Sequence, residues 1–207
     1  MKRKSLILML LLLAGMSAFR FSHTGKIPKD WRLILVNSEN PIPYGYEPEL
    51  MQLSNGVRID SRIYPDLQRM FDDARSSGVY PVAVEGYRTH EEQKKMMSDK
   101  IESFVEEGHS RTEAKKLARE WVAEAGKSEH EIGLALDINA DQSQSTDGEV
   151  YDWLAENAYK YGFILRYPPD KEDITGIDYE AWHYRYVGTE TASEIHERNI
   201  TLEEYLS

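Results

Sequence analysis

The chain has 207 residues, enough for one domain with a single sizeable core, and 41% of them are apolar. It contains no cysteine, which excludes thiolate catalysis, disulfides and cysteine-based zinc sites. Its formal net charge of -11 argues against nucleic acid as a partner, because phosphate binding needs clustered Lys and Arg. A transition-metal site in this chain must therefore use His, Asp or Glu.

The N-terminus has the pattern of a targeting segment. A basic stretch (residues 2–4) precedes an apolar run from Leu6 to Ala14, shorter than the ~20 residues of a comfortable transmembrane helix. This order is typical of a secretory signal, although Met16 is bulky for a cleavage site that ends at Ala18. Residues 1–21 are therefore predicted to be a signal peptide or an N-terminal membrane anchor. Either interpretation places the rest of the chain outside the cytoplasmic membrane, secreted or anchored.

Residues 22–48 differ in composition from the rest of the chain. They carry four of the eight prolines and two glycines, which favours a linker and extended arm, with WRLILVN (31–37) as one strand. A single folded domain is expected over residues 49–207.

Within that domain, the spacing of apolar residues and of glycines predicts alternating helices and strands. In chain order they are a helix from about Arg62 closed by Gly78, a strand over 79–87, a helical stretch over 89–125 broken at Gly108, a strand over 133–139, a helix over 150–161, strands over 163–167 and 182–188, and short helices over 189–198 and 201–206. The connections are irregular. The predicted class is α+β, a small antiparallel or mixed sheet with helices packed on one side.

Two of the six histidines stand out, because His130 and His183 each lie at the edge of an apolar segment with carboxylates nearby. The surroundings of the other four are polar, which favours solvated surface side chains, although His90 lies close to Arg88. A single histidine in a strand is more often a core residue satisfied by one hydrogen bond. The residues around each histidine must therefore show whether it is a core residue or a metal ligand.

The segment SEHEIGLALDINA (128–140) places Asp137 inside an apolar run. Strand alternation puts Ala135 on the same face as Asp137, and Gly133 would let the backbone turn so that His130 reaches the same point. A buried lone carboxylate is costly unless it is paired or bound to a metal. A salt bridge is one explanation; a zinc site of two histidines and one aspartate, with a fourth position open, is the other.

The segment YEAWHYRYVG (179–188) places Glu180 three residues before His183. On a straight strand these side chains point to opposite faces, so both can face one site only if the backbone bends there. A metallohydrolase needs a carboxylate of this kind to take a proton from the attacking water. The alternative is that Glu180 pairs with a surface arginine such as Arg185.

The segment EGYRTHEEQ (85–93) places Arg88 where a strand ends and a helix begins. An arginine there can bind a carboxylate through two hydrogen bonds or stabilise an oxyanion. The alternative is a structural ion pair with an acidic neighbour.

Taken together, the three segments resemble a known family. The pattern S-x-H-x-x-G-x-A-x-D followed by E-x-W-H, with an upstream G-Y-R-T-x-x-x-Q block, is similar to the zinc D-alanyl-D-alanine carboxypeptidases of the VanY type and the related L,D-carboxypeptidases. The resemblance extends from about Leu35 to Gly188. One difference is Ala181, where a proline is common in the family; a proline would stiffen the bend that aims Glu180 and His183 at the metal.

The resemblance implies a role for each of eight residues and a Hedgehog/D-Ala-D-Ala peptidase-like fold with its zinc site at the sheet. The zinc ligands would be His130, Asp137 and His183. Glu180 would be the catalytic base, Arg88 would steady the substrate carbonyl or the oxyanion, and the substrate pocket would include Ser128, Gln93 and Trp182.

The function implied is removal of the C-terminal D-alanine from peptidoglycan stem peptides by a zinc-dependent, monomeric D,D-carboxypeptidase. Membrane contact is expected only through the N-terminal segment. Two alternatives stay open at this point: an L,D-carboxypeptidase that acts on tetrapeptide stems, and an inactive zinc-stabilised cell-wall-binding module. The presence of Glu180 beside the ligands favours activity.

Overall fold

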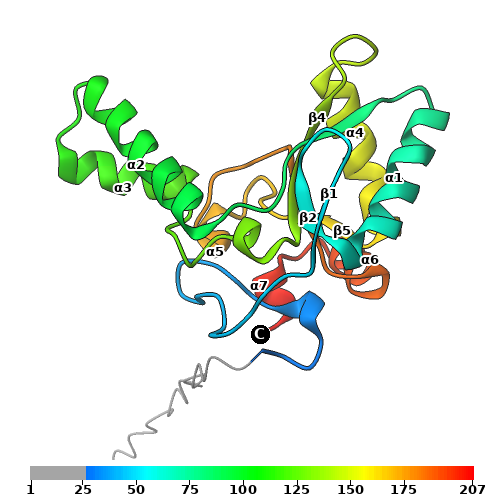
Figure 1. Ribbon diagram of the computed structural model, residues 1–207, viewed down its shortest axis with the longest axis horizontal. Helices are drawn as coiled ribbons and strands as arrows, with labels where there is room; N and C mark the ends of the chain where they lie inside the picture. Colours follow the sequence, from blue (N-terminus) through cyan, green and yellow to red (C-terminus); the bar gives the residue numbers. More distant parts are fainter. Residues whose placement is uncertain (1–26) are drawn as a thin grey trace, which may run out of the picture.

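The computed structural model describes residues 27–207 (Figure 1). Its centre is a four-stranded antiparallel sheet with the strand order β3-β4-β6-β5. The strands are β3 (Pro81–Glu85), β4 (Ala135–Ala140), β5 (Phe163–Leu165) and β6 (His183–Tyr186). A separate antiparallel hairpin, which the sequence did not predict, is formed by β1 (Leu50–Gln52) and β2 (Arg58–Asp60). The predicted α+β class with a small antiparallel sheet is confirmed.

One face of β4 belongs to the hydrophobic core. Leu136 and Ile138 are fully buried there, together with apolar residues of helices α1 (Tyr64–Ser76) and α4 (Asp147–Asn157). Helix α1 contributes a stripe at helical spacing, namely Leu67, Met70, Phe71 and Ala74. Because successive strand residues alternate between faces, Asp137 points away from this core, as expected from the sequence.

The long charged segment after β3 folds into two helices, α2 (His90–Glu106) and α3 (Arg111–Trp121). Thr89 caps α2 in a reciprocal arrangement with Glu92, and Ser110 accepts a hydrogen bond at the start of α3. The two helices pack on each other as a hairpin that projects from the body of the molecule (Figure 1). Only the base of this hairpin lies near the sheet.

The strand predicted over 31–37 is not formed. Trp31–Leu33 is a 3-10 helix capped by Asp30, and Ile34 and Val36 continue into the core. The backbone carbonyls of Arg32 and Ile34 each accept a hydrogen bond of 2.8 Å from the buried guanidinium of Arg185. The guanidinium of Arg185 thus satisfies two backbone carbonyls that would pair with a neighbouring strand if this segment lay in a sheet.

The remaining elements surround the sheet. They are the 3-10 helices η2 (Ser61–Ile63), η3 (Glu129–Ile132) and η4 (Ala158–Tyr161), and the helices α5 (Glu172–Thr175), α6 (Thr189–Arg198) and α7 (Leu202–Tyr205). No helix within residues 27–207 is long and apolar enough to cross a membrane. The predicted targeting segment lies outside the described residues.

Candidate functional site

His130 is held by the short helix η3. The hydroxyl of Ser128 caps this helix, accepting from the backbone N–H of His130, and Gly133 ends it with a left-handed φ of 73°. Nδ1 of His130 lies 2.7 Å from the carbonyl oxygen of Gly86. A carbonyl can only accept, so Nδ1 carries the proton and Nε2 presents its lone pair to the site.

Gly86 can approach this closely because it has no side chain. A Cβ there would lie 2.9 Å from Cγ1 of Val57 and would also meet the carbonyl of Arg58. The glycine therefore brings the end of β3 against β2 and places its own carbonyl beside the ring of His130.

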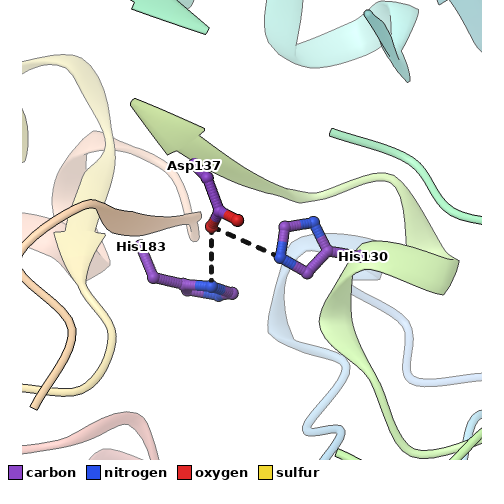
Figure 2. A group of neighbouring side chains, drawn as sticks. All are labelled: His130, Asp137 and His183. Atoms are coloured by element: carbon purple, nitrogen blue, oxygen red, sulfur yellow. Dashed lines mark ion pairs between the residues drawn. The ribbon is translucent and has the colours of Figure 1, made fainter. Parts of the chain in front are cut away.

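Asp137 and His183 face each other across neighbouring strands, since they are register partners in β4 and β6. Oδ1 of Asp137 lies 3.4 Å from Nε2 of His130 and 3.2 Å from Nδ1 of His183 (Figure 2). One ligand atom from each residue falls within 4.8 Å of the other two. The three side chains that the sequence singled out are thus brought together.

This arrangement fits a zinc ion. Two N or O ligands bound tetrahedrally at ~2.0–2.1 Å lie about 3.3–3.4 Å apart, close to the two separations around Asp137. Oδ1 of Asp137 is buried and has no hydrogen-bond partner in the described part of the chain. Burial alone would lower the pKa of His183, but the carboxylates of Asp137 and Glu129 outweigh it and raise that pKa to about 9. The site therefore attracts positive charge.

Glu180 reaches the same point through a turn. The backbone N–H of His183 donates to the carbonyl of Glu180, which forms the bend that the three-residue spacing requires. Oε2 of Glu180 lies 3.4 Å from Nδ1 of His183. Burial is the largest influence on this carboxyl and raises the pKa of Glu180 to about 7. A group with such a pKa can both accept and return a proton near neutral pH.

Arg88 is fixed on three sides. Its Nε donates to Glu85 (2.7 Å), its Nη1 to the amide oxygen of Gln93 (2.8 Å), and its Nη2 lies 3.5 Å from Oδ2 of Asp137. The amide group of Gln93 donates to the carbonyl of Ala123. Both ends of the Gln93 amide are thereby occupied, and its oxygen holds the guanidinium of Arg88 beside Asp137.

A cavity of about 240 Å³ joins these residues. It is lined by all eight predicted site residues, and further walls come from the base of the α2–α3 hairpin and from Tyr167. Among the hairpin residues, Lys100 lies over the ring of Trp121, 4.6 Å from the ring centroid. Of the residues of α2 and α3, the sequence predicted only Gln93 to lie at the site.

Comparison with known proteins agrees with this geometry. The family model VanY, described as D-alanyl-D-alanine carboxypeptidase, matches residues 56–189, more than half of the chain. The chain belongs to the VanY family. It is 55% identical over 179 residues to a D-alanyl-D-alanine carboxypeptidase of Enterococcus faecalis strain V583, covering 86% of this chain and 67% of that relative.

Solved structures of similar proteins also superpose well on this one. VanYB in complex with D-alanine-D-alanine matches with a TM-score of 0.84 and 56% identity, over 85% of this chain and 97% of that one. A point mutant of a D,D-pentapeptidase VanY, in complex with Zn(II), gives the same TM-score and identity, and the match covers 86% of this chain and 99% of that one. The LD-carboxypeptidase LdcB matches with a TM-score of 0.70 and 37% identity, and the match covers 83% of this chain and 84% of that one. The protein is a zinc enzyme of the VanY carboxypeptidase type.

Sequence reasoning missed a buried ion cluster behind the metal site of this VanY-family protein. Glu129 accepts hydrogen bonds from Arg166 (2.8 Å) and Arg185 (2.7 Å), and all three side chains are fully buried. Burial raises the pKa of Glu129, but the two guanidinium groups outweigh it and hold the pKa well below its usual range. The alternative in which Arg185 is a surface partner for Glu180 is wrong, because Arg185 is buried and bound to Glu129.

Proposed function

We propose that this protein removes the terminal D-alanine from peptidoglycan stem peptides, with His130, Asp137 and His183 as the zinc ligands. The observation that carries the proposal is the meeting of these three ligand atoms with a buried carboxylate of raised pKa, Glu180, in one cavity. The close relatives named above support D,D-specificity, because they share 55–56% identity with this chain, against 37% for the LD-carboxypeptidase.

Glu180 is the proton carrier in this proposal. When bound, zinc supplies a Lewis acid that polarises the scissile carbonyl and lowers the pKa of water toward ~7. Glu180 takes a proton from the attacking water as the new C–O bond forms. It then gives that proton to the nitrogen of the departing D-alanine as the C–N bond breaks.

Arg88 stabilises the negative charge that develops on the carbonyl oxygen. Its guanidinium is already anchored by Glu85 and Gln93, so it does not need to reorganise during the reaction. Ser128 and Trp182 line the cavity around the substrate. We expect the enzyme to act as a monomer.

The specificity can be tested with pentapeptide stems ending in D-Ala-D-Ala and tetrapeptide stems ending in a single D-alanine. We expect the protein to shorten the pentapeptide by one D-alanine, and a zinc chelator to stop the reaction. Mass spectrometry of the products distinguishes the activities. Release of D-alanine from the tetrapeptide alone would identify an L,D-carboxypeptidase, and turnover of neither stem would identify an inactive binding module.

We also propose that the protein acts outside the cytoplasmic membrane. The support is the basic and apolar composition of residues 1–21 and the peptidoglycan substrate. We expect fractionation of cells to recover the protein from the membrane if the segment is kept, or from the medium in a shortened form if it is cleaved. Full-length protein recovered only from the cytosol would contradict export.

A further inference from the structure

The side of His183 that faces away from Asp137 meets the carboxylate of Glu129. Nε2 of His183 lies 3.7 Å from Oε2 of Glu129, and both side chains are buried. Both atoms are without a hydrogen-bond partner in the part of the chain that the structure describes. Two complementary groups therefore face each other with no other described protein atom to satisfy them.

The other oxygen of Glu129 is fully used. Oε1 accepts from Nε of Arg166 and from Nη1 of Arg185. Each arginine is fixed in turn, Arg166 by Glu203 at 2.6 and 2.9 Å and Arg185 by two backbone carbonyls. The carboxylate is thus locked in one orientation, and that orientation directs Oε2 at the ring of His183.

We propose that Glu129 is a positioning residue for the metal ligand His183: it accepts the Nε2–H of the imidazole and thereby directs the Nδ1 lone pair toward Asp137 and the metal. The inference rests on the proposed function, because it takes His183 as a zinc ligand. A neutral imidazole carries one N–H, so a fixed acceptor at Nε2 determines which nitrogen is free to bind. Carboxylates that hold a ligating histidine in this way typically change metal affinity when they are removed.

The competing explanation is that Glu129 only neutralises two buried arginines. Glu203 offers a matched control, because it is the other carboxylate on Arg166 and the ion pair that it forms there does not involve His183. Loss of either carboxylate removes a negative charge from the same buried cluster. Only loss of Glu129 removes the acceptor at Nε2.

Glu129→Gln is the sharpest variant. Arginine side chains can only donate, so Arg166 and Arg185 will bind the amide oxygen of the new glutamine. The NH₂ group of that glutamine then points at Nε2 of His183. That donor favours the wrong tautomer, with the proton on Nδ1. We expect zinc affinity to fall by ~10–100-fold in Glu129→Gln and to stay near that of the wild type in Glu203→Gln.

Zinc affinity should be measured by competition with a chromophoric chelator, beside thermal unfolding of the metal-free proteins. Equal affinities of wild type and Glu129→Gln would overturn the proposal, whereas failure of the wild type itself to bind zinc would overturn the proposed function. If Glu129→Gln does not fold, Glu129→Asp keeps the charge for both arginines but draws the oxygen away from His183. We then expect weaker zinc binding with little change in unfolding temperature, and wild-type affinity would contradict the inference.

The tautomer gives an independent readout. In zinc-loaded protein, ¹⁵N resonances of His183 should show a proton on Nε2 and none on Nδ1. A proton on Nδ1 in the zinc-loaded wild type would exclude the proposed hydrogen bond.

Discussion

Replacing Glu180 by glutamine should abolish most turnover while leaving the metal in place. Gln has nearly the same size as Glu but cannot take up a proton, so we expect kcat to fall by ~10²–10⁴-fold, the usual contribution of a proton-transfer group. The metal ligands are untouched by this change. Zinc content of the purified variant should therefore equal that of the wild type.

A matched control is available in the same segment. Asp178 is the other carboxylate close to Glu180 in sequence, and it is a minor influence on the pKa of Glu180. Asp178→Asn should retain turnover close to that of the wild type. If instead Glu180→Gln turned over substrate at the wild-type rate, the proton would have to be carried by another group.

Replacing Arg88 by lysine should lower turnover with little change in the Michaelis constant. An ammonium group cannot reproduce the planar fork that contacts Glu85 and Gln93 at once, so the charge loses its fixed position. Nη2 of Arg88 lies beside Oδ2 of Asp137, which puts the guanidinium next to the metal site. We therefore assign it to the oxyanion, and removal of such a donor typically lowers kcat by ~10²–10³-fold.

Steady-state kinetics on a pentapeptide distinguishes the two roles of Arg88. A raised Michaelis constant with unchanged turnover would assign Arg88 to the substrate carboxylate, because binding would then be equal in ground and transition states. Arg119→Lys is a suitable control, since Arg119 is exposed on α3 and pairs only with Glu124 among the described residues. Its kinetic constants should not change.

The parts of the site that the sequence predicts are those with a strong local pattern. Asp137 is recognisable because a carboxylate interrupts an alternating apolar strand, and the glycine at 133 marks the turn that brings His130 back. The spacing of Glu180 and His183 requires a bend if both side chains are to face one site, and the structure contains that bend. In each case neighbours in the chain are also neighbours in space.

The parts that the sequence does not predict depend on contacts between distant segments. Arg166 and Arg185 look like surface residues, since charged side chains are rarely fully buried, and only pairing with Glu129 makes their burial tolerable. The same guanidinium of Arg185 binds two backbone carbonyls within residues 31–37, where the sequence predicts a strand, and these lie 153 and 151 residues earlier in the chain. The sequence pattern around a residue does not show which distant segment will contact it in the fold.

The metal content of the purified protein is the most direct test of the proposed zinc site. Elemental analysis of folded wild-type protein should find about one zinc ion per chain, and Asp137→Ala, which removes the oxygen that lies between both histidines, should lose it. A folded wild-type protein that binds no zinc, or an Asp137→Ala variant that binds zinc as tightly as the wild type, would contradict the assignment of His130, Asp137 and His183 as ligands.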